Sequence, residues 1–411
     1  INIKILSMNR LLIILSILFL FSSCDSWIDV KPENQVTYTN YFETEKDVEG
    51  AAFQMFAAEC AYIGCEGDYL KWLGILADEW TDTYNAPRLG RASDLANGWG
   101  ESGWKSSYDI VFLANTILEN ASRADMPKDR LNFWMGQASF TKGLAYFELA
   151  RTFGDAVITR NSTSLEKYGR KPMLEVIDTA IVNAVKAYNL LPLFENLKDL
   201  SGAAITSKQY ACKGAAVALL AHLYAWRGSV IELYGLEGDA PADYQKSIDY
   251  CTLILDKKVG FYEMQPDPET LCAVMSKMGE YNKESIFELE LNPSETYAQT
   301  VRVLGAFLTG YPVDVNATLA TQKTKAFRLK WSTVQEMYET KDKRVDAYFY
   351  TNDEILNDLQ TYPYIYLKKW REGIYFMSSS GSTATRMTGL RANQVQWRVA
   401  DIYLLRAECR A

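Results

Sequence analysis

One stretch constrains the fold of this chain more than any other, the segment from Arg130 to Asp155, which reads RLNFWMGQASFTKGLAYFELARTFGD. Its large apolar residues recur at helical spacing, and Gly154 follows where a helix C-cap is expected. Small residues keep its other faces thin enough for neighbouring helices to approach closely: Gly136, Ala138, Ser139, Gly143 and Ala145. The segment therefore predicts a buried helix with packing partners on more than one side.

Other amphipathic stretches supply those partners. Apolar stripes from Trp104 to Leu118 predict a helix that pairs with the central one. Residues 177–191 and 208–227 form a second predicted pair, and Tyr244 to Leu255 begins a third. Repeated helix pairs are the unit from which helical arrays are built, so the chain is expected to be mostly helical.

The remaining elements are shorter. Further helices are expected at residues 45–61 (capped by Thr44), 70–80, 331–338 and 394–411, and strands at 285–291 and around Tyr362, Tyr364 and Tyr366. Two irregular stretches rich in aromatic residues stand out between these elements, residues 78–104 and 292–315. Long loops inside a compact protein commonly carry function, so both are candidate binding regions.

Composition excludes several functions. The formal net charge of -8 gives no basic surface for a phosphate backbone, so nucleic-acid binding is not expected. His222 is the only histidine and lies in an apolar helical stretch, where a packed or partly exposed role is expected. No nucleophile has a base beside it in the sequence, and no cluster of metal ligands is evident, so neither an enzyme nor a cofactor is expected.

Two short patterns resemble ligand-binding motifs, but ordinary loop or helix structure is the favoured interpretation of each. Gly98 to Gly103 formally matches a dinucleotide-binding pattern, yet no strand precedes it, so it predicts a loop. The acidic residues Asp78, Glu79 and Asp82 could hold calcium, but a solvated helix end is the favoured interpretation.

The N-terminus reads as an export signal. Lys4 and Arg10 precede an apolar run, which ends in Phe-Ser-Ser before Cys24. This ending resembles a lipobox, so residues 1–23 are the predicted signal peptide and Cys24 the predicted acylation site of a domain spanning 24–411. Plain secretion is the alternative. A disulfide between Cys60 and Cys65 is left open. The chain is also expected to be a fragment that lacks its C-terminal part.

Several segments together resemble the SusD/RagB family of outer-membrane nutrient-binding lipoproteins. They are CDSWIDVKPE after Cys24, YFETEKDVEGAAFQMF, WKSSYDIVFLANTILENA, GQASFTKGLAYFELARTFGD, ITSKQYACKGAAVALLAHLYAWRG, ESIFELELN and WRVADIYLLRAE. The resemblance implies tetratricopeptide-like helix pairs in a right-handed superhelix, with long loops and a few short strands. His222 departs from the family, which more often has Arg there.

The resemblance also implies a function, the capture of a nutrient, most often a glycan, and its delivery to a SusC-like TonB-dependent transporter at the outer membrane of a Gram-negative cell. Aromatic rings can stack on the apolar faces of sugars while polar side chains bind the hydroxyl groups. The ligand residues expected from the two irregular stretches are Trp80, Asp82, Tyr84, Asn85, Arg88, Trp99 and Tyr311. Trp104 and Trp226 lie on helix stripes and are expected in the core.

Three alternatives to glycan capture are open. A RagB-like protein would bind peptides, through backbone pairing rather than ring stacking. A helical scaffold would recruit a protein and bind no small ligand. A hydrolase would need a carboxylate pair assembled in space, which a sequence does not reveal.

Overall fold

The computed structural model describes residues 41–64, 80–81, 101–164, 166–276, 282–290, 313–314, 316, 328–339, 341–350, 364–365, 367–369, 371–377, 384–390 and 393–411. The chain divides into two units, Ile1–Glu43 and Thr44–Ala411. In the described part of the first unit, the rings of Tyr41 and Phe42 meet edge to face, with their centroids 5.0 Å apart.

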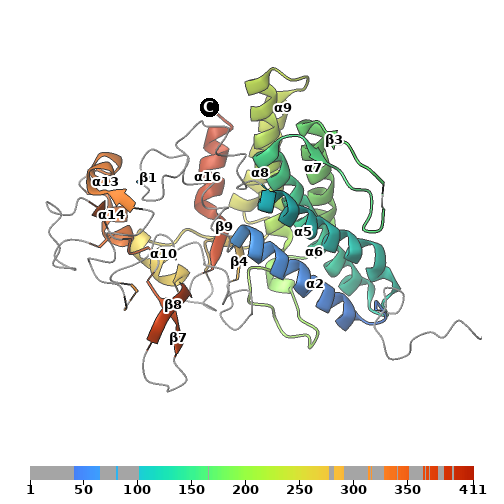
Figure 1. The fold of residues 1–411 in the computed structure, drawn as a ribbon. Helices are drawn as coiled ribbons and strands as arrows, with labels where there is room; N and C mark the ends of the chain where they lie inside the picture. The colour runs from blue at the N-terminus through green and yellow to red at the C-terminus, as the bar shows by residue number, and fades with distance from the viewer. Residues whose placement is uncertain are drawn as a thin grey trace, which may run out of the picture. The chain divides into compact units, whose positions relative to one another are not determined.

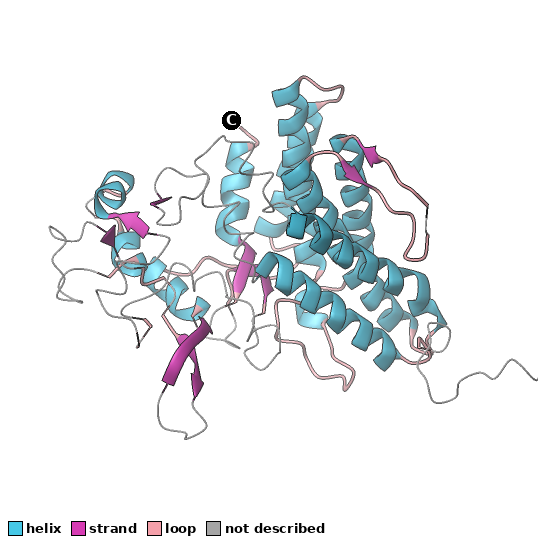
Figure 2. Ribbon diagram, in the orientation of Figure 1, coloured by secondary structure: helices cyan, strands magenta, loops and turns pink. Residues whose placement is uncertain are grey.

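The second unit is mostly helical, as predicted (Figures 1 and 2). Its described α-helices are α2 (Glu45–Glu59), α5 (Glu101–Asn120), α6 (Lys128–Phe153), α7 (Met173–Leu190), α8 (Lys213–Tyr234), α9 (Ala240–Leu255), α10 (Pro268–Met275), α13 (Trp331–Met337), α14 (Lys343–Tyr348) and α16 (Val399–Glu408). A π-helical segment, η2 (Cys60–Gly64), follows α2, and two short 3-10 helices are η3 (Ala121–Arg123) and η4 (Phe194–Asn196).

Helix α6 is the central helix that the sequence predicts. Nearly all of its residues from Phe133 to Ala150 are buried, and it ends before Gly154, whose φ of 72° suits a residue without a side chain. Helices α5 and α7 pack along it. A Cβ atom on Gly143 would lie 3.1 Å from the carbonyl oxygen of Ala180 on α7, so the glycine lets the two helices approach closely.

Helices α7, α8 and α9 continue the array, each packed against the next. Helix α8 begins at Lys213, five residues later than predicted, because other partners hold the preceding backbone. Both backbone groups of Ala211 bond to the side-chain amide of Gln137, and the carbonyl of Lys208 accepts from the amide of Glu288. By length and composition α8 could cross a membrane, but most of it is buried among the other helices, as a core helix is.

The predicted helix at residues 394–411 is wrong in its first part. Residues Gln394–Arg398 form strand β9, which pairs antiparallel with β4 (Ser285–Leu289), and only then does α16 begin. All five residues of β4 are buried. The ring of Trp397 lies 6.3 Å from that of Phe140 on α6, so this strand pair packs on the central helix and supplies contacts that a lone helix would lack.

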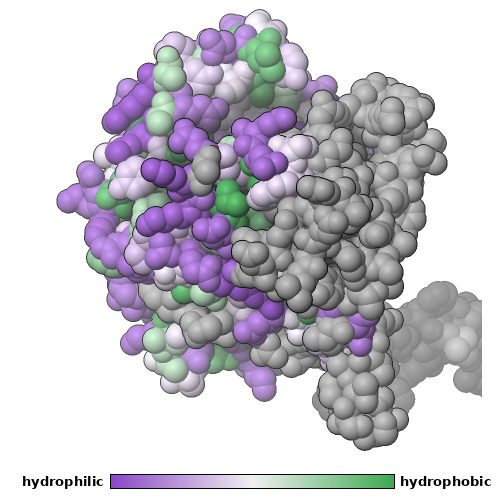
Figure 3. All heavy atoms as spheres, turned by 90° about the vertical axis from the view of Figure 1, so that its left-hand side faces the viewer, coloured by the Kyte–Doolittle hydropathy of each residue, from purple (hydrophilic) through white to green (hydrophobic). Residues whose placement is uncertain are grey.

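The other short strands are β1 (Trp80–Thr81), β2 (Ala156–Val157), β3 (Arg170–Lys171), β5 (Arg328–Lys330), β6 (Tyr364–Ile365), β7 (Gly373–Met377) and β8 (Ala384–Leu390). β1, β5 and β6 form one sheet, and β7 pairs with β8. The predicted helix at 70–80 is therefore wrong at Trp80, which is in a strand. The described atoms on the face shown in Figure 3 are mainly hydrophilic, with hydrophobic residues scattered singly.

Candidate functional site

The first predicted binding stretch has its two ends in different elements. Trp80 and Thr81 pair with Leu329 and Arg328 of β5, and Glu101 begins α5. The structure describes the backbone of Trp80 but not its side chain. The other predicted residues of this stretch lie outside the described residues: Asp82, Tyr84, Asn85, Arg88 and Trp99. Sequence reasoning missed the pairing with β5, because a two-residue strand leaves no periodic signal.

The second predicted stretch is anchored near its end. Tyr311 lies outside the described residues, but Val313, two positions later, is buried. Its carbonyl oxygen accepts a hydrogen bond of 2.7 Å from the hydroxyl of Tyr375 on β7. The β7–β8 hairpin therefore holds the chain close to Tyr311.

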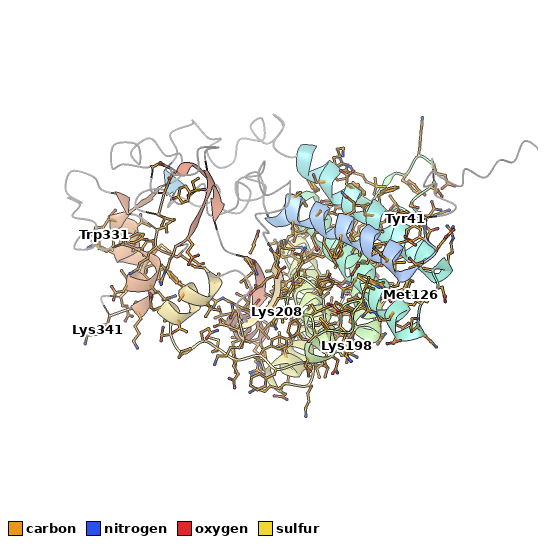
Figure 4. The ribbon with its side chains drawn as sticks, turned by 90° about the horizontal axis from the view of Figure 1, so that it is seen from below. Tyr41, Met126, Lys198, Lys208, Trp331 and Lys341 are labelled. Carbon is orange, nitrogen blue, oxygen red and sulfur yellow. The ribbon has the colours of Figure 1, made fainter. Side chains whose placement is uncertain are left out.

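These anchors belong to the part of the second unit that carries β1, β5, β6 and the β7–β8 hairpin. Trp331, which follows β5 directly, and Lys341 lie on one side in Figure 4, and Lys198 and Met126 of the helical array lie on the other. In Figure 1, α13, α14 and the β7–β8 hairpin are likewise apart from α6 and α7. One described end of each predicted stretch, Thr81 in the first and Val313 in the second, thus leads to the same part of the molecule, although these two residues are more than two hundred positions apart in sequence.

The tryptophans predicted for the core are packed, but only half-buried. The ring of Trp104 contacts Tyr108 and Phe153, with centroids 5.1 Å and 5.2 Å away, and the guanidinium of Arg170 lies 4.8 Å above it. Trp226 packs edge to face on Phe147 at 6.3 Å. Each ring thus has aromatic neighbours and serves helix packing.

His222 is a packed, partly exposed residue, as predicted. Its ring stacks on that of Trp397 on β9, with centroids 5.5 Å apart, and its buried Nε2 has no hydrogen-bond partner within the described chain. Burial, together with the nearby Arg151, lowers the pKa of His222 to about 4. The imidazole is therefore neutral at pH 7, and its contacts are those of a core residue.

Two buried carboxylates, those of Asp243 and Glu284, are held in ion pairs. Asp243 accepts from Arg227 at 2.6 Å, and Glu284 pairs with Arg398. Such pairs are costly to break, because the remaining charge is left without compensation. Over the described ranges, no group of three or more His, Cys, Asp or Glu side chains could hold a metal ion. Asp78, Glu79 and Asp82 lie outside these ranges.

Of the two cysteines that could form a disulfide, Cys60 is buried beside α2. Its Sγ lies 3.4 Å from the carbonyl oxygen of Glu290, and the amide of Gln209 donates to it at 3.2 Å. Cys65 and the predicted acylation site Cys24 lie outside the described residues.

The structure adds one cavity that sequence reasoning missed. It has a volume of about 440 Å³ and lies where the start of α6, the end of α7 and the start of α8 meet. Its polar residues come from three separate segments, which include Arg130, Lys198 and Lys213, and no local motif marks them.

With the fold established, comparison with known family models gives a match over part of the chain. Residues 73–225 match the SusD-like family that is described as starch-binding and associating with the outer membrane. Over these residues the chain is SusD-like, in agreement with the resemblance predicted from its sequence. No curated protein sequence matches it.

Solved structures share the fold of this SusD-like chain over most of its length. A SusD homologue from Bacteroides thetaiotaomicron superimposes with a TM-score of 0.65 at 17% identity, covering 90% of this chain and 78% of the homologue. A laminarin-binding SusD-like protein gives 0.60 at 15% identity, covering 90% and 81%. NanU of B. fragilis gives 0.62 at 16% identity, covering 93% and 76%. The expected helix-pair architecture is thereby confirmed.

Proposed function

We propose that this SusD-like chain is a lipid-anchored outer-membrane protein that captures a glycan at the cell surface and delivers it to a SusC-like TonB-dependent transporter. The observation that carries the proposal is the match of residues 73–225 to a starch-binding family. A laminarin-binding relative with the same fold supports a carbohydrate ligand. In this role the protein binds and presents its ligand and performs no chemistry on it.

The proposed glycan site uses the aromatic rings of the two irregular stretches. Trp80, Tyr84, Trp99 and Tyr311 would stack on sugar rings, with Asp82, Asn85 and Arg88 bonding to hydroxyl groups. One stacked ring contributes roughly 1–2 kcal/mol, so several are needed for useful affinity. The anchoring of Thr81 in a sheet and of Val313 by Tyr375 supports a site whose loops are fixed at defined points.

The test is electrophoresis of the detergent-solubilised full chain through native gels that contain a panel of soluble polysaccharides. We expect one polysaccharide class to retard the protein. The combined substitution Trp80→Ala, Tyr84→Ala and Trp99→Ala should abolish the retardation. Tyr234→Ala is the matched control, because this ring is 63% exposed at the end of α8 and outside the proposed site.

Other results would favour other functions. Retardation that survives the triple substitution would place the glycan elsewhere. Heat released by a peptide digest, with no response to any polysaccharide, would favour RagB-like peptide capture. A folded protein that responds to neither would favour a scaffold. Steady release of reducing ends from an oligosaccharide, lost on substitution of one carboxylate, would show a hydrolase.

A further inference from the structure

The cavity at the start of α6 has the features of a second binding site. Its volume of about 440 Å³ is in the range of small-molecule pockets. Phe133 and the leucines of residues 190–197 form an apolar wall. The polar residues around it are Asp129, Arg130, Asn132, Asn196, Lys198 and Lys213. None of them belongs to the proposed glycan stretches.

Arg130 is held in place with one donor group to spare. Its Nε donates to Glu45 Oε1 at 2.6 Å, and its Nη1 donates to the carbonyl oxygen of Lys198 at 2.7 Å. The guanidinium lies 4.7 Å above the ring of Phe133. Its Nη2 is buried, yet it has no hydrogen-bond partner within the described residues. A fixed guanidinium with an unsatisfied buried N–H group favours an acceptor supplied by a ligand.

Positive charge prevails around the cavity, in a chain whose net charge is -8. Asp129 is the only carboxylate among the lining residues, against Arg130, Lys198 and Lys213. Glu45 offsets part of the Arg130 charge, but it also accepts from Trp134 Nε1 at 2.9 Å. Within the described chain neither lysine forms an ion pair, and the ammonium of Lys213 lies 5.0 Å from the ring of Tyr188.

We propose that this cavity binds the carboxylate-bearing ring of an acidic sugar. The carboxylate would meet Arg130 and the two lysines, while Asn132, Asn196 and Asp129 would bond to hydroxyl groups. The apolar wall suits the CH face of the ring. The choice of a sugar over another carboxylate rests on the proposed glycan-binding function.

The test is calorimetric titration of the full chain in detergent with galacturonic acid. Galactose is the neutral counterpart, and a short peptide with a free C-terminus is the other source of a carboxylate. We expect galacturonic acid to bind at least about tenfold more tightly than either. The double substitution Lys198→Gln and Lys213→Gln should weaken its binding about tenfold, and binding should fall as salt rises.

Two further variants make the result specific. Lys105→Gln, which removes an exposed lysine on α5, should leave the affinity unchanged. The Trp80, Tyr84 and Trp99 triple alanine variant should also bind galacturonic acid normally. Equal binding of galacturonic acid and galactose, or an unchanged double lysine variant, would overturn the proposal. So would preferential binding of the peptide, or loss of binding in the triple variant.

These outcomes separate the two proposals. If galacturonic acid binds through Lys198 and Lys213 while no polysaccharide retards the protein, the cavity proposal stands and the glycan-loop proposal fails. If a polysaccharide retards the protein through its loops while the protein binds galacturonic acid no better than galactose, the glycan-loop proposal stands and the cavity proposal fails.

Discussion

Glu59 is a carboxylate that the fold has removed from water. It is 1% exposed at the end of α2, and neither of its oxygens has a hydrogen-bond partner in the described part of the chain. Burial raises the pKa of Glu59 to about 8. The folded protein therefore keeps this proton at neutral pH, whereas the unfolded chain releases it above pH 4.5 or so.

This difference makes stability depend on pH. Between pH 4.5 and about 8 the folded state binds more protons at Glu59 than the unfolded state, so its contribution to the free energy of unfolding falls as the pH rises. At pH 7 this titration lowers the free energy of unfolding by an amount on the order of 3 kcal/mol.

We predict that Glu59→Gln raises the midpoint of urea unfolding at pH 7 and flattens its dependence on pH between pH 5 and about 8. The substitution removes the titrating group and keeps its shape. Glu237→Gln, on the exposed turn after α8, is the control and should change neither. An unaltered pH dependence in Glu59→Gln would show that this carboxyl is not the group responsible.

At the scale of elements, the contact between α6 and α7 depends on a missing side chain. Gly143 lies against the backbone of α7, where a Cβ atom would be 3.1 Å from Ala180 O and 3.3 Å from Ala184 N. Backbone atoms of a packed helix cannot move aside as a flexible side chain can. Any branched residue at this position has to push the two helices apart.

We predict that Gly143→Val lowers the free energy of unfolding by about 2 kcal/mol, measured by urea denaturation. Gly169→Val is the matched control, because nothing lies within 4 Å of a Cβ atom built there, and it should cost less than about 0.5 kcal/mol. Equal losses in the two variants would mean that the close approach of α6 and α7 is not what the glycine provides.

The secondary structure of β9 depends on its pairing with β4, which lies far away in the sequence. Residues 394–398 carry a sequence that extends the apolar pattern of α16, and local reasoning predicts a single helix. Pairing with β4 and the ion pair between Arg398 and the buried Glu284 decide otherwise. Contacts between residues more than a hundred positions apart overrode local preference here.

At the scale of the whole molecule, the proposed role requires a membrane anchor. Several acyl chains on one cysteine exceed what stable anchoring needs. We predict that Cys24→Ala, expressed in a Gram-negative host, moves the protein from the membrane fraction to the soluble fraction and abolishes incorporation of labelled palmitate. Cys409→Ser, at the partly exposed residue that directly follows α16, should retain both the label and the membrane location. A labelled Cys24→Ala protein would place the lipid elsewhere.

The sequence by itself determined the helical array. Helical periodicity placed α2, α5, α6, α7 and α9 to within a few residues, because a helix that buries one stripe must repeat its apolar residues at the period of its own turn. Small residues on the central helix also foretold its close packing, which α5 and α7 confirm. Family-like segments spread along the chain pointed to the SusD/RagB family.

Tertiary structure alone decided the rest. The pairing of Trp80 with β5, the hydrogen bond that fixes Val313, and the strand at 394–398 all join segments that are far apart in sequence. The cavity at Arg130 likewise gathers residues from three separate segments. The periodicity of a segment shows only which of its faces is buried. Which segments pack against that face depends on how the whole chain folds.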